Sequence, residues 1–593
     1  MNILGIGGLL GHDSNASLVV NGEVIFAAQE ERFSRIKHDA SFPIQAIKEC
    51  LAYAHIDFED IDVVVLAEKP VEDYFFKNFK FPFPKVLGFT RKYFEKKAIK
   101  NTPFLKSIKT LFPNAQIKYS WHHFSHVIAA YYSSEYSEAA FICVDGKGEF
   151  ANASIGFIDK NNATITHELP YGNGLGLLYT MISHFLGFPS VGSEYKVMGL
   201  APYGKPRFVE KIKELFYDHG DGAIILKKEI GFHPTDIANS MPWMEKVLGI
   251  SHRNPQELLQ DEHVDLASSI QSVFEEIILK MAAFVKSNFQ SNNLLFCGGC
   301  AQNCVAAGKL LETKIFDNVF NSPVGGDMGS SLGAILAYTY ASKFEHATKF
   351  DFKGYYLGSK PGEITNPTAK YFQVSLGENI YEFMAQELSK GKIIAWVQAG
   401  MELGARSLGA RSILANPLIP NIQTDLNLKI KFRESFRPFA PAILIEEASN
   451  WFEINQPSNY MQFTAYLKPE LRFPSLENYG SFKENLNFPR CAIPSVVHVD
   501  YSARLQTVSK EIHPEFHQLL ERFKAHTGIP ILINTSFNVN GQPIVRTADE
   551  AWECFINTDV DLLVIDDKVY RNPFDKTKDQ KLKWLSQFKK FSN

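Results

Sequence analysis

Two histidines and two aspartates have the side-chain types and the spacing to bind a metal ion. His122 and His126 are four residues apart in a helical pattern, so their imidazoles share one face and can reach one cation. Asp145 ends a predicted strand at a glycine turn, and Asp327 lies between a predicted strand and the start of a helix. Together they would form a His₂Asp₂ set, whose mixed nitrogen and oxygen shell suits Fe²⁺, Mn²⁺ or Zn²⁺. The alternative is that the histidines are ordinary helix residues and the aspartates are caps or turn residues.

Basic residues in the second half of the chain are placed to bind an anion. Arginine makes bidentate contacts to phosphate or carboxylate, and hydroxyls and amides in a turn at a strand end can complete an oxyanion pocket. Surface salt bridges are the alternative, but these residues lie in turns rich in glycine and proline rather than on a solvent-facing helix. The segments are GARSLGARSILAN (404–416), LNLKIKFRESFRPFAPAIL (426–444), SARLQTV (502–508) and ILINTSFNVNGQPIV (531–545).

A glycine pair and three cysteines lie close together near the middle of the chain. Gly298 and Gly299 precede a predicted helix, and a glycine turn at that position offers backbone N–H groups to phosphate. Cys297, Cys300 and Cys304 form a C-x₂-C-x₃-C run with no fourth cysteine nearby. We therefore expect buried structural thiols rather than a metal or iron–sulfur site.

The predicted elements in the first half form two similar α/β units. A strand at 3–8, two β-rich runs separated by Asn21-Gly22, a helix at 42–54 and a strand at 62–68 have the order β-β-β-α-β. This order resembles the RNase H-like unit of the actin–hexokinase superfamily. A second unit of similar order begins near residue 139. The two units would occupy about 1–345, with a cleft between them.

The rest of the chain is divided by a polar stretch that glycine and proline interrupt. We predict an N-terminal domain over 1–350, a linker over 351–378 and a second α/β domain over 379–593. Residues 69–115 are aromatic and basic, and we interpret them as an insertion with a solvated face.

The bulk composition excludes several classes of protein. A net charge of −4 and a sequence pI near 6.5 argue against a dedicated nucleic-acid binder. No apolar run approaches the roughly 20 residues that span a bilayer, and the N-terminal residues do not resemble a signal peptide. Seven cysteines in 593 residues do not form a disulfide scaffold. We therefore expect a cytoplasmic protein without a membrane or nucleic-acid partner.

Along nearly its whole length the chain resembles the NodU/CmcH carbamoyltransferase family. Many motifs carry the resemblance, and they occur in the family's order. In the first half they are GHDSNASL, QEERFSRIKHD, HHFSH, VDGKGE, GSEYKVMGLAPYG, GGCAQN and PVGGDMGSSLGA, and in the second half ELGARSLGARSIL, FRESFRPFAPAIL, CAIPSVVHVDYSARLQTV and NTSFNVNGQPIV.

The resemblance implies a fold and a reaction. It implies an N-terminal actin-like (ASKHA) domain with two RNase H-like lobes and a C-terminal YrdC-like α/β domain. Carbamoyl phosphate would bind the YrdC-like domain and lose phosphate, and ATP would capture the carbamate as carbamoyladenylate with release of pyrophosphate. The carbamoyl group would then pass to a hydroxyl of a small-molecule acceptor, a sugar or a natural product, in the metal-bearing domain.

The resemblance also assigns roles to individual residues. His12 would be the general base, since an imidazole with a near-neutral pKa suits that task. The four metal ligands agree with the His₂Asp₂ set, with Fe²⁺ as the expected ion and Mn²⁺ or Zn²⁺ as alternatives. Lys37, Gly298, Gly299 and Asn303 would bind the nucleotide, and Arg406, Lys431, Arg437, Arg504, Ser536 and Asn538 would bind carbamoyl phosphate.

Rival interpretations remain at this point. A tRNA threonylcarbamoyl-transfer enzyme shares both domain types, and a non-catalytic nucleotide-binding regulator is an alternative of another class. A hydrogenase-maturation enzyme would need zinc-finger segments, which the cysteine spacing does not supply. A sugar kinase would not explain the basic residues of the second domain. The acceptor and the oligomeric state are open, and a homodimer is one option.

Overall fold

The computed structural model describes most of the chain. The described residues are 1–9, 11–69, 103–146, 148–149, 151–170, 174–189, 192–227, 229, 237–342, 354–365, 379–473, 490–572 and 577–588. The predicted insertion at 69–115 and the predicted linker at 351–378 fall largely outside these ranges.

The first unit is built on a five-stranded sheet with the order β3-β2-β1-β4-β5. Its first three strands are antiparallel, with the hairpin at Asn21-Gly22 as predicted, and the last two run parallel to β1. The predicted order β-β-β-α-β is therefore present. The elements are β1 (Asn2–Gly7), β2 (Asn15–Val20), β3 (Glu23–Gln29), α1 (Glu31–Ser34), α2 (Ile44–Ala54), η1 (Phe58–Asp60), β4 (Val63–Leu66), α5 (Pro103–Leu111) and β5 (Gln116–Tyr119).

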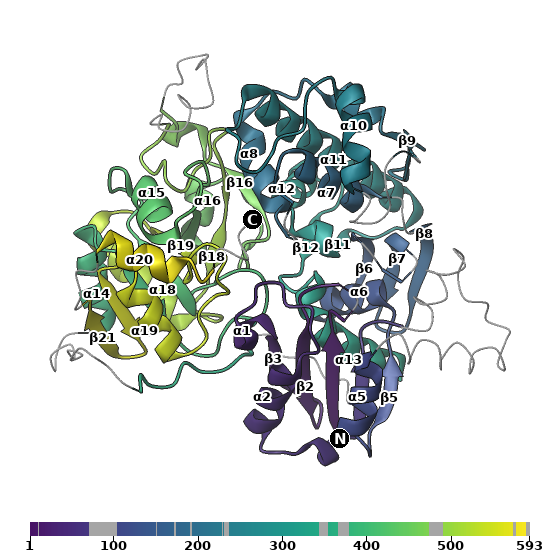
Figure 1. The fold of residues 1–593 in the computed structure, drawn as a ribbon, viewed down its shortest axis with the longest axis horizontal. Coiled ribbons are helices and arrows are strands. Elements are labelled where there is room, and N and C mark those ends of the chain that lie inside the picture. The colour runs from purple at the N-terminus through teal and green to yellow at the C-terminus, as the bar shows by residue number, and fades with distance from the viewer. Residues whose placement is uncertain are drawn as a thin grey trace.

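The second unit repeats this topology. Read as β8-β7-β6-β11-β12, its sheet has the same order and the same strand directions, three antiparallel strands followed by two parallel ones. Most of its helices gather in the upper part of the view, above the strands of this sheet (Figure 1). The elements are α6 (His122–Ser133), β6 (Glu138–Val144), β7 (Ala151–Asp159), β8 (Ala163–Pro170), α7 (Leu175–Phe185), α8 (Glu194–Leu200), η2 (Ala201–Tyr203), α9 (Val209–Lys213), β9 (Phe216–Asp218), β10 (Ile224–Leu226), α10 (Ile237–Leu248), α11 (Asp261–Asn288), β11 (Asn293–Cys297), η4 (Gly299–Gln302), α12 (Cys304–Thr313), β12 (Asn318–Asn321), η5 (Asp327–Gly329) and α13 (Ser330–Ala341).

Helix α13 joins the two units, because small residues let backbones approach closely on both of its faces. A Cβ on Gly5 of β1 would lie 2.1 Å from the Ser331 carbonyl oxygen, and a Cβ on Gly333 would lie 2.3 Å from the Ser125 carbonyl oxygen in α6. The hydroxyls of Ser17 and Ser331 are 2.7 Å apart in the buried contact. As a result the ends of β1, α6 and α13 meet at one place.

The third unit contains a seven-stranded mixed sheet with the order β18-β15-β19-β14-β13-β20-β21. Its core is a separate large cluster of buried apolar side chains that includes the fully buried Trp396. The elements are α14 (Ile380–Ser389), β13 (Ile394–Val397), β14 (Arg411–Ala415), α15 (Ile422–Asp425), η6 (Leu426–Lys431), β15 (Ala440–Leu444), η7 (Ile445–Glu447), α16 (Ala448–Trp451), β16 (Thr464–Tyr466), η8 (Pro469–Leu471), β17 (Ser502–Arg504), β18 (Gln506–Val508), α18 (Pro514–Thr527), β19 (Ile531–Ser536), α19 (Ala548–Ile556), β20 (Leu562–Ile565), β21 (Lys568–Arg571) and α20 (Lys578–Leu585).

The chain is thus a mixed α/β protein, as predicted. The further identification of the first two units as an actin-like domain, and of the third as a YrdC-like domain, stays a prediction. None of the helices within the described residues is both long and apolar enough to cross a membrane.

The third unit is docked against the first. Arg35, just after α1, donates hydrogen bonds of 2.9 Å to the carbonyl oxygens of Pro543 and Ile544. The described part of the predicted linker, residues 354–365, lies in the same interface, where the Leu357 carbonyl accepts from the Ala27 amide at 3.1 Å. This part of the linker is therefore packed against both units, and Tyr355 within it is completely buried.

Candidate active site: a metal cluster and an anion cluster

The two predicted histidine ligands lie on the first turns of α6 and face the same way. Both lie on a helix, as the spacing predicted, and that helix begins at His122. The Glu149 carboxylate accepts a 3.1 Å hydrogen bond from the His122 amide. That carboxylate satisfies one of the free N–H groups of the helix terminus. It holds the start of α6 against the segment that follows Asp145.

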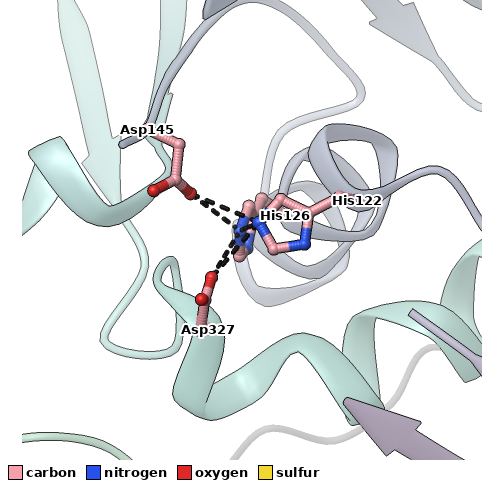
Figure 2. Close-up of side chains that lie close together, drawn as sticks. All are labelled: His122, His126, Asp145 and Asp327. Carbon is pink, nitrogen blue, oxygen red and sulfur yellow. Dashed lines mark hydrogen bonds and ion pairs between the residues drawn. The ribbon is translucent and has the colours of Figure 1, made fainter. Parts of the chain in front are cut away.

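The structure brings all four predicted ligands together (Figure 2). His126 Nε2 is 3.1 Å from Asp145 Oδ2 and 3.5 Å from Asp327 Oδ1, and the two histidine Nε2 atoms are 3.1 Å apart. His122 Nε2 lies 3.5 Å and 3.2 Å from the same two carboxylate oxygens. Four tetrahedral ligands about 2.1 Å from a metal are roughly 3.4 Å from one another. We call His122, His126, Asp145 and Asp327 the metal cluster.

The electrostatics of the metal cluster also suit a cation. Burial alone would favour neutral acids, but the close contacts of Asp145 with the His122 and His126 imidazoles outweigh it and hold the pKa of Asp145 well below its ordinary range. The pKa of Asp327 is likewise lowered. Among the described residues, Asp145 Oδ2 and Asp327 Oδ1 are buried without a conventional hydrogen-bond partner. Two buried carboxylate oxygens that face two imidazole nitrogens are a fitting donor set for a divalent metal.

His12 lies beside the metal cluster, after the end of β1. Its Nε2 is 3.9 Å from Asp327 Oδ2, and its side chain is 44% exposed, so a substrate can reach it. Its Nδ1 is 2.8 Å from Asp13 Oδ2. Burial lowers the pKa of His12, but the Asp13 hydrogen bond and the charges of Asp327 and Asp145 together raise it to about 9. Asp327 and Asp145 are the proposed metal ligands, so a bound cation would offset their charges and bring the pKa of His12 back toward the near-neutral range that suits a general base.

Sequence reasoning missed the partner of His12. Asp13 is almost fully buried and carries a second imidazole, with His38 Nδ1 at 3.0 Å from its other oxygen. Asp13 also has φ of 56°, a left-handed conformation that Asp and Asn tolerate better than most residues. The carboxylate of Asp13 thus orients His12, and the signal in sequence was its place directly after His12.

The residues predicted to bind the nucleotide lie in different places and make different contacts. Gly298 has φ of 88°, and a Cβ on Gly299 would lie 2.9 Å from Asp145 Oδ1, so this turn packs against the metal cluster. Asn303 caps α12 by accepting from the Ala306 amide and exchanges hydrogen bonds with Gln271. Lys37 lies near the anion-binding residues, where its charge lowers the pKa of Lys431.

The cysteines behave as structural thiols. Cys297 and Cys304 are buried and Cys300 is partly buried, and all are free. Burial, and then the charge of Asp145, raise the pKa of Cys300 well above the ordinary value. A thiol of this kind remains protonated and is a poor metal ligand.

The predicted lysine, serine and asparagine of the anion site form one compact group. Lys431 Nζ lies 2.7 Å from the Ser536 carbonyl oxygen and 2.9 Å and 2.6 Å from the Asn538 carbonyl and Oδ1 atoms. Lys431 is only 3% exposed and touches no carboxylate in these bonds. Burial, and then the charge of Arg433, hold its pKa well below the ordinary value. The ammonium therefore orders the turn after β19 and lacks a counter-charge.

Arg433, from the predicted basic segment, and the predicted ligand Arg437 lie close enough to this group for their charges to lower the pKa of Lys431. The predicted ligands Arg406 and Arg504 interact through their charges with each other, and Arg504 also interacts with Arg433. Burial, and then the charge of Arg504, lower the pKa of Arg406 to about 9. Burial and the charge of Arg437 lower the pKa of Arg433 to about 9. Arg437 and Arg504 each have a buried Nε without a hydrogen-bond partner among the described residues. We call Arg406, Lys431, Arg433, Arg437, Arg504, Ser536 and Asn538 the anion cluster.

The charge of the anion cluster is incompletely balanced by protein groups. Glu434 pairs with Arg437 and lies 3.5 Å from Lys196. Buried charges are stable only when they are paired. Unpartnered guanidinium N–H groups around a buried ammonium therefore favour a bound anion such as a phosphate.

Comparisons with known proteins show the family to which the chain belongs. Residues 2–336 match the model described as carbamoyltransferase N-terminus, and residues 385–572 match carbamoyltransferase C-terminus. An uncharacterised protein of Synechocystis is 37% identical, with 99% of each chain covered. The nodulation protein NolNO of Sinorhizobium fredii is 31% identical over 93% of this chain and 78% of its own. The chain belongs to the carbamoyltransferase family, and it is a carbamoyltransferase enzyme.

Solved structures show only distant likeness. The full-length HypF structure in its phosphate- and nucleotide-bound form has a TM-score of 0.33 and 12% identity, over 58% of this chain and 56% of its own. Component A of the (R)-2-hydroxyglutaryl-CoA dehydratase of Acidaminococcus fermentans has a TM-score of 0.33 and 15% identity, over 59% of this chain and all of its own. Scores this low contribute nothing to the assignment.

Proposed function

We propose that this carbamoyltransferase consumes carbamoyl phosphate and ATP to make carbamoyladenylate and transfers the carbamoyl group to a hydroxyl of a small molecule, a sugar or a natural product. Carbamoyl phosphate and water would give carbamate and phosphate, and carbamate and ATP would give carbamoyladenylate and pyrophosphate. The observation that carries the proposal is the presence, in one chain, of two buried clusters. One is an anion cluster in which Arg437 and Arg504 have buried Nε atoms without a hydrogen-bond partner among the described residues, and the other is a metal cluster whose four ligand atoms lie within 4.8 Å of one another.

In this proposal the anion cluster binds carbamoyl phosphate. Arg406, Arg437 and Arg504 would contact the phosphate oxygens, while Lys431 holds Ser536 and Asn538 in place through the bonds at 2.6–3.2 Å. The guanidinium groups would stabilise the charge that develops on the departing phosphate. Burial of the site would limit access of water to the carbamate, which hydrolyses readily.

The metal cluster and His12 would carry the transfer step. A bound Fe²⁺, Mn²⁺ or Zn²⁺ would act there as a Lewis acid toward the carbamoyl or phosphate oxygens. His12 would take the proton of the acceptor hydroxyl at Nε2, since Asp13 holds Nδ1 at 2.8 Å. Lys37 and the Gly298-Gly299 turn would bind the nucleotide, with Asn303 supporting that turn from the start of α12.

The test is to incubate the protein with carbamoyl phosphate, ATP and Fe²⁺ without acceptor, and to measure carbamoyladenylate and pyrophosphate by mass spectrometry. We expect both products. We expect Arg437→Ala to reduce the amount of both about 100-fold, because the phosphate of carbamoyl phosphate loses a charged hydrogen-bond donor. Lys429→Ala is the matched control, because Lys429 lies in the same basic segment but is 60% exposed and pairs with Asp425. Unchanged ATP in the presence of carbamoyl phosphate would contradict the proposal.

A further inference from the structure

One segment of the N-terminal units lies over the anion cluster. It comprises α8 and η2, residues 194–203. The Tyr203 hydroxyl donates to the Phe436 carbonyl oxygen at 2.9 Å, and His498 Nε2 lies 2.9 Å from the Gly199 carbonyl oxygen. Lys196 at the other end lies 3.5 Å from Glu434. The segment is therefore held in place against the loop that carries Arg433 and Arg437.

Tyr195 is the residue of this segment that faces the arginines. The guanidinium of Arg437 stacks on the Tyr195 ring at 4.8 Å, and Arg437 Nη1 donates to the Tyr195 hydroxyl oxygen at 3.1 Å. Charge interactions link Tyr195 to Arg406 and Arg433 as well. Tyr195 thus lies among three cationic residues of the anion cluster although it belongs to a different unit of the chain.

The direction of the Arg437 hydrogen bond leaves the phenol hydrogen free to donate elsewhere. Arginine has only N–H donors, so the tyrosine oxygen must be the acceptor in this bond. Among the described residues, the Tyr195 hydroxyl makes no hydrogen bond other than the one that it accepts from Arg437. A donor surrounded by cations, beside the unpartnered Nε of Arg437, is suited to an anion oxygen.

We propose that the Tyr195 hydroxyl binds carbamoyl phosphate directly, so that the anion site is composed of both domains. This proposal rests on the proposed function for the identity of the anion. It makes the N-terminal units necessary for tight binding at a site whose other residues all come from the third unit. The competing explanation is that Tyr195 only holds Arg437 in place through its ring.

Tyr195→Phe separates these explanations, because phenylalanine keeps the stacking ring and removes the hydroxyl. The dissociation constants of carbamoyl phosphate and of inorganic phosphate are measured for the full-length protein by isothermal titration calorimetry. We expect both constants to rise about tenfold, the loss for one hydrogen bond to a charged group. Tyr203→Phe is the matched control, since it also removes one hydroxyl contact between the segment and the third unit. We expect it to leave both constants within about twofold of wild type.

The outcomes separate the Tyr195 proposal from the proposed function. Wild-type protein that binds inorganic phosphate but never consumes carbamoyl phosphate would contradict the proposed function, while Tyr195→Phe would still decide the role of Tyr195. Wild-type affinity for both anions in Tyr195→Phe, or equal losses in both variants, would overturn the Tyr195 proposal alone. Failure of the wild type to bind either anion would overturn both.

Discussion

The metal cluster and the anion cluster are opposite in charge and alike in construction. The first gathers buried carboxylate oxygens opposite imidazole nitrogens, and the second gathers guanidinium and ammonium groups with few carboxylates. Each contains buried polar atoms that lack conventional partners, such as Asp145 Oδ2 in one and Arg504 Nε in the other. Burial magnifies the cost of an unbalanced charge in both places.

The comparison shows how each cluster selects its ligand. A divalent cation would neutralise the carboxylates of the first, and a phosphate would neutralise the arginines of the second, so the two ligands cannot exchange sites. The metal cluster takes residues from several parts of the N-terminal units, and α13 packs closely against β1 and against α6, the helix that carries both histidines. The anion cluster takes residues from turns of the third unit, and Tyr195 alone is proposed to reach it from outside.

The largest effect is expected from Asp145→Asn. This change removes the carboxylate that lies 3.1 Å from His126 and 3.5 Å from His122. We expect loss of bound metal and at least a 100-fold fall in carbamoyl transfer, because a first-row metal needs its charged ligands. Metal content by plasma mass spectrometry and phosphate affinity by calorimetry are measured together.

The phosphate affinity of Asp145→Asn should remain that of wild type, and Arg437→Ala should show the reverse pattern. The exposed Asp317 supplies the control, since Asp317→Asn removes a carboxylate elsewhere in the N-terminal units. Simultaneous loss of metal and phosphate binding in Asp145→Asn would show that the two clusters are not independent.

A smaller effect is expected from Asp13→Asn. Asparagine tolerates the left-handed conformation at this position, so the fold should survive while His12 loses its charged partner. We expect the turnover number to fall about 10- to 100-fold with full metal content, since orientation of the general base is lost. His38→Gln, which alters the other imidazole on the same carboxylate, should have a weaker effect. Loss of metal from Asp13→Asn would contradict this assignment.

The smallest effect is expected at His498, where the third unit contacts α8 of the N-terminal units. His498 is buried, donates from Nε2 to the Gly199 carbonyl and accepts at Nδ1 from the Val499 amide. Burial lowers its pKa, so the unfolded chain takes up a proton at this group more readily than the folded chain. Its contribution to stability is therefore present above about pH 6.5 and is lost as the pH falls toward the lower folded value.

We expect the melting temperature to fall as the pH is lowered from 7.5 to 5. We expect His498 to contribute about 1 kcal/mol to the accompanying loss in the free energy of unfolding. His498→Gln should melt at a lower temperature near pH 7.5 but show a shallower pH dependence. The exposed His219 gives the control His219→Gln, whose pH dependence should equal that of wild type. An unchanged pH dependence in His498→Gln would contradict the role assigned to His498.

Some of the site could be predicted from sequence because it depends on local spacing. His122 and His126 are one helical turn apart, and that spacing alone places both imidazoles on one side of α6. The hairpin at Asn21-Gly22 follows from turn preferences of the same local kind. Asp145 and Asp327 could be named because strand ends and glycine turns are visible in the sequence.

Other parts depend on contacts between residues that are distant in the chain. Asp13 meets His38, and Tyr195 meets Arg437, across separations that no periodicity reveals. The pKa of His12 depends on the charges of Asp327 and Asp145, which come from distant parts of the chain and could not be placed beside His12 from the sequence. The hydrogen bonds from the Lys431 ammonium to the turn at Ser536 and Asn538 join segments about 105 residues apart and are of the same kind.

The sequence by itself determined the mixed α/β class, the four metal-cluster residues and the carbamoyltransferase family, because these follow from local patterns and ordered motifs. Only the tertiary structure decided which buried charges lack a partner and which side chains of the N-terminal units reach the anion cluster. The physical reason is that burial and pairing are properties of neighbours in space. Close packing of α13 between β1 and α6, and of α8 against the third unit, creates those neighbours.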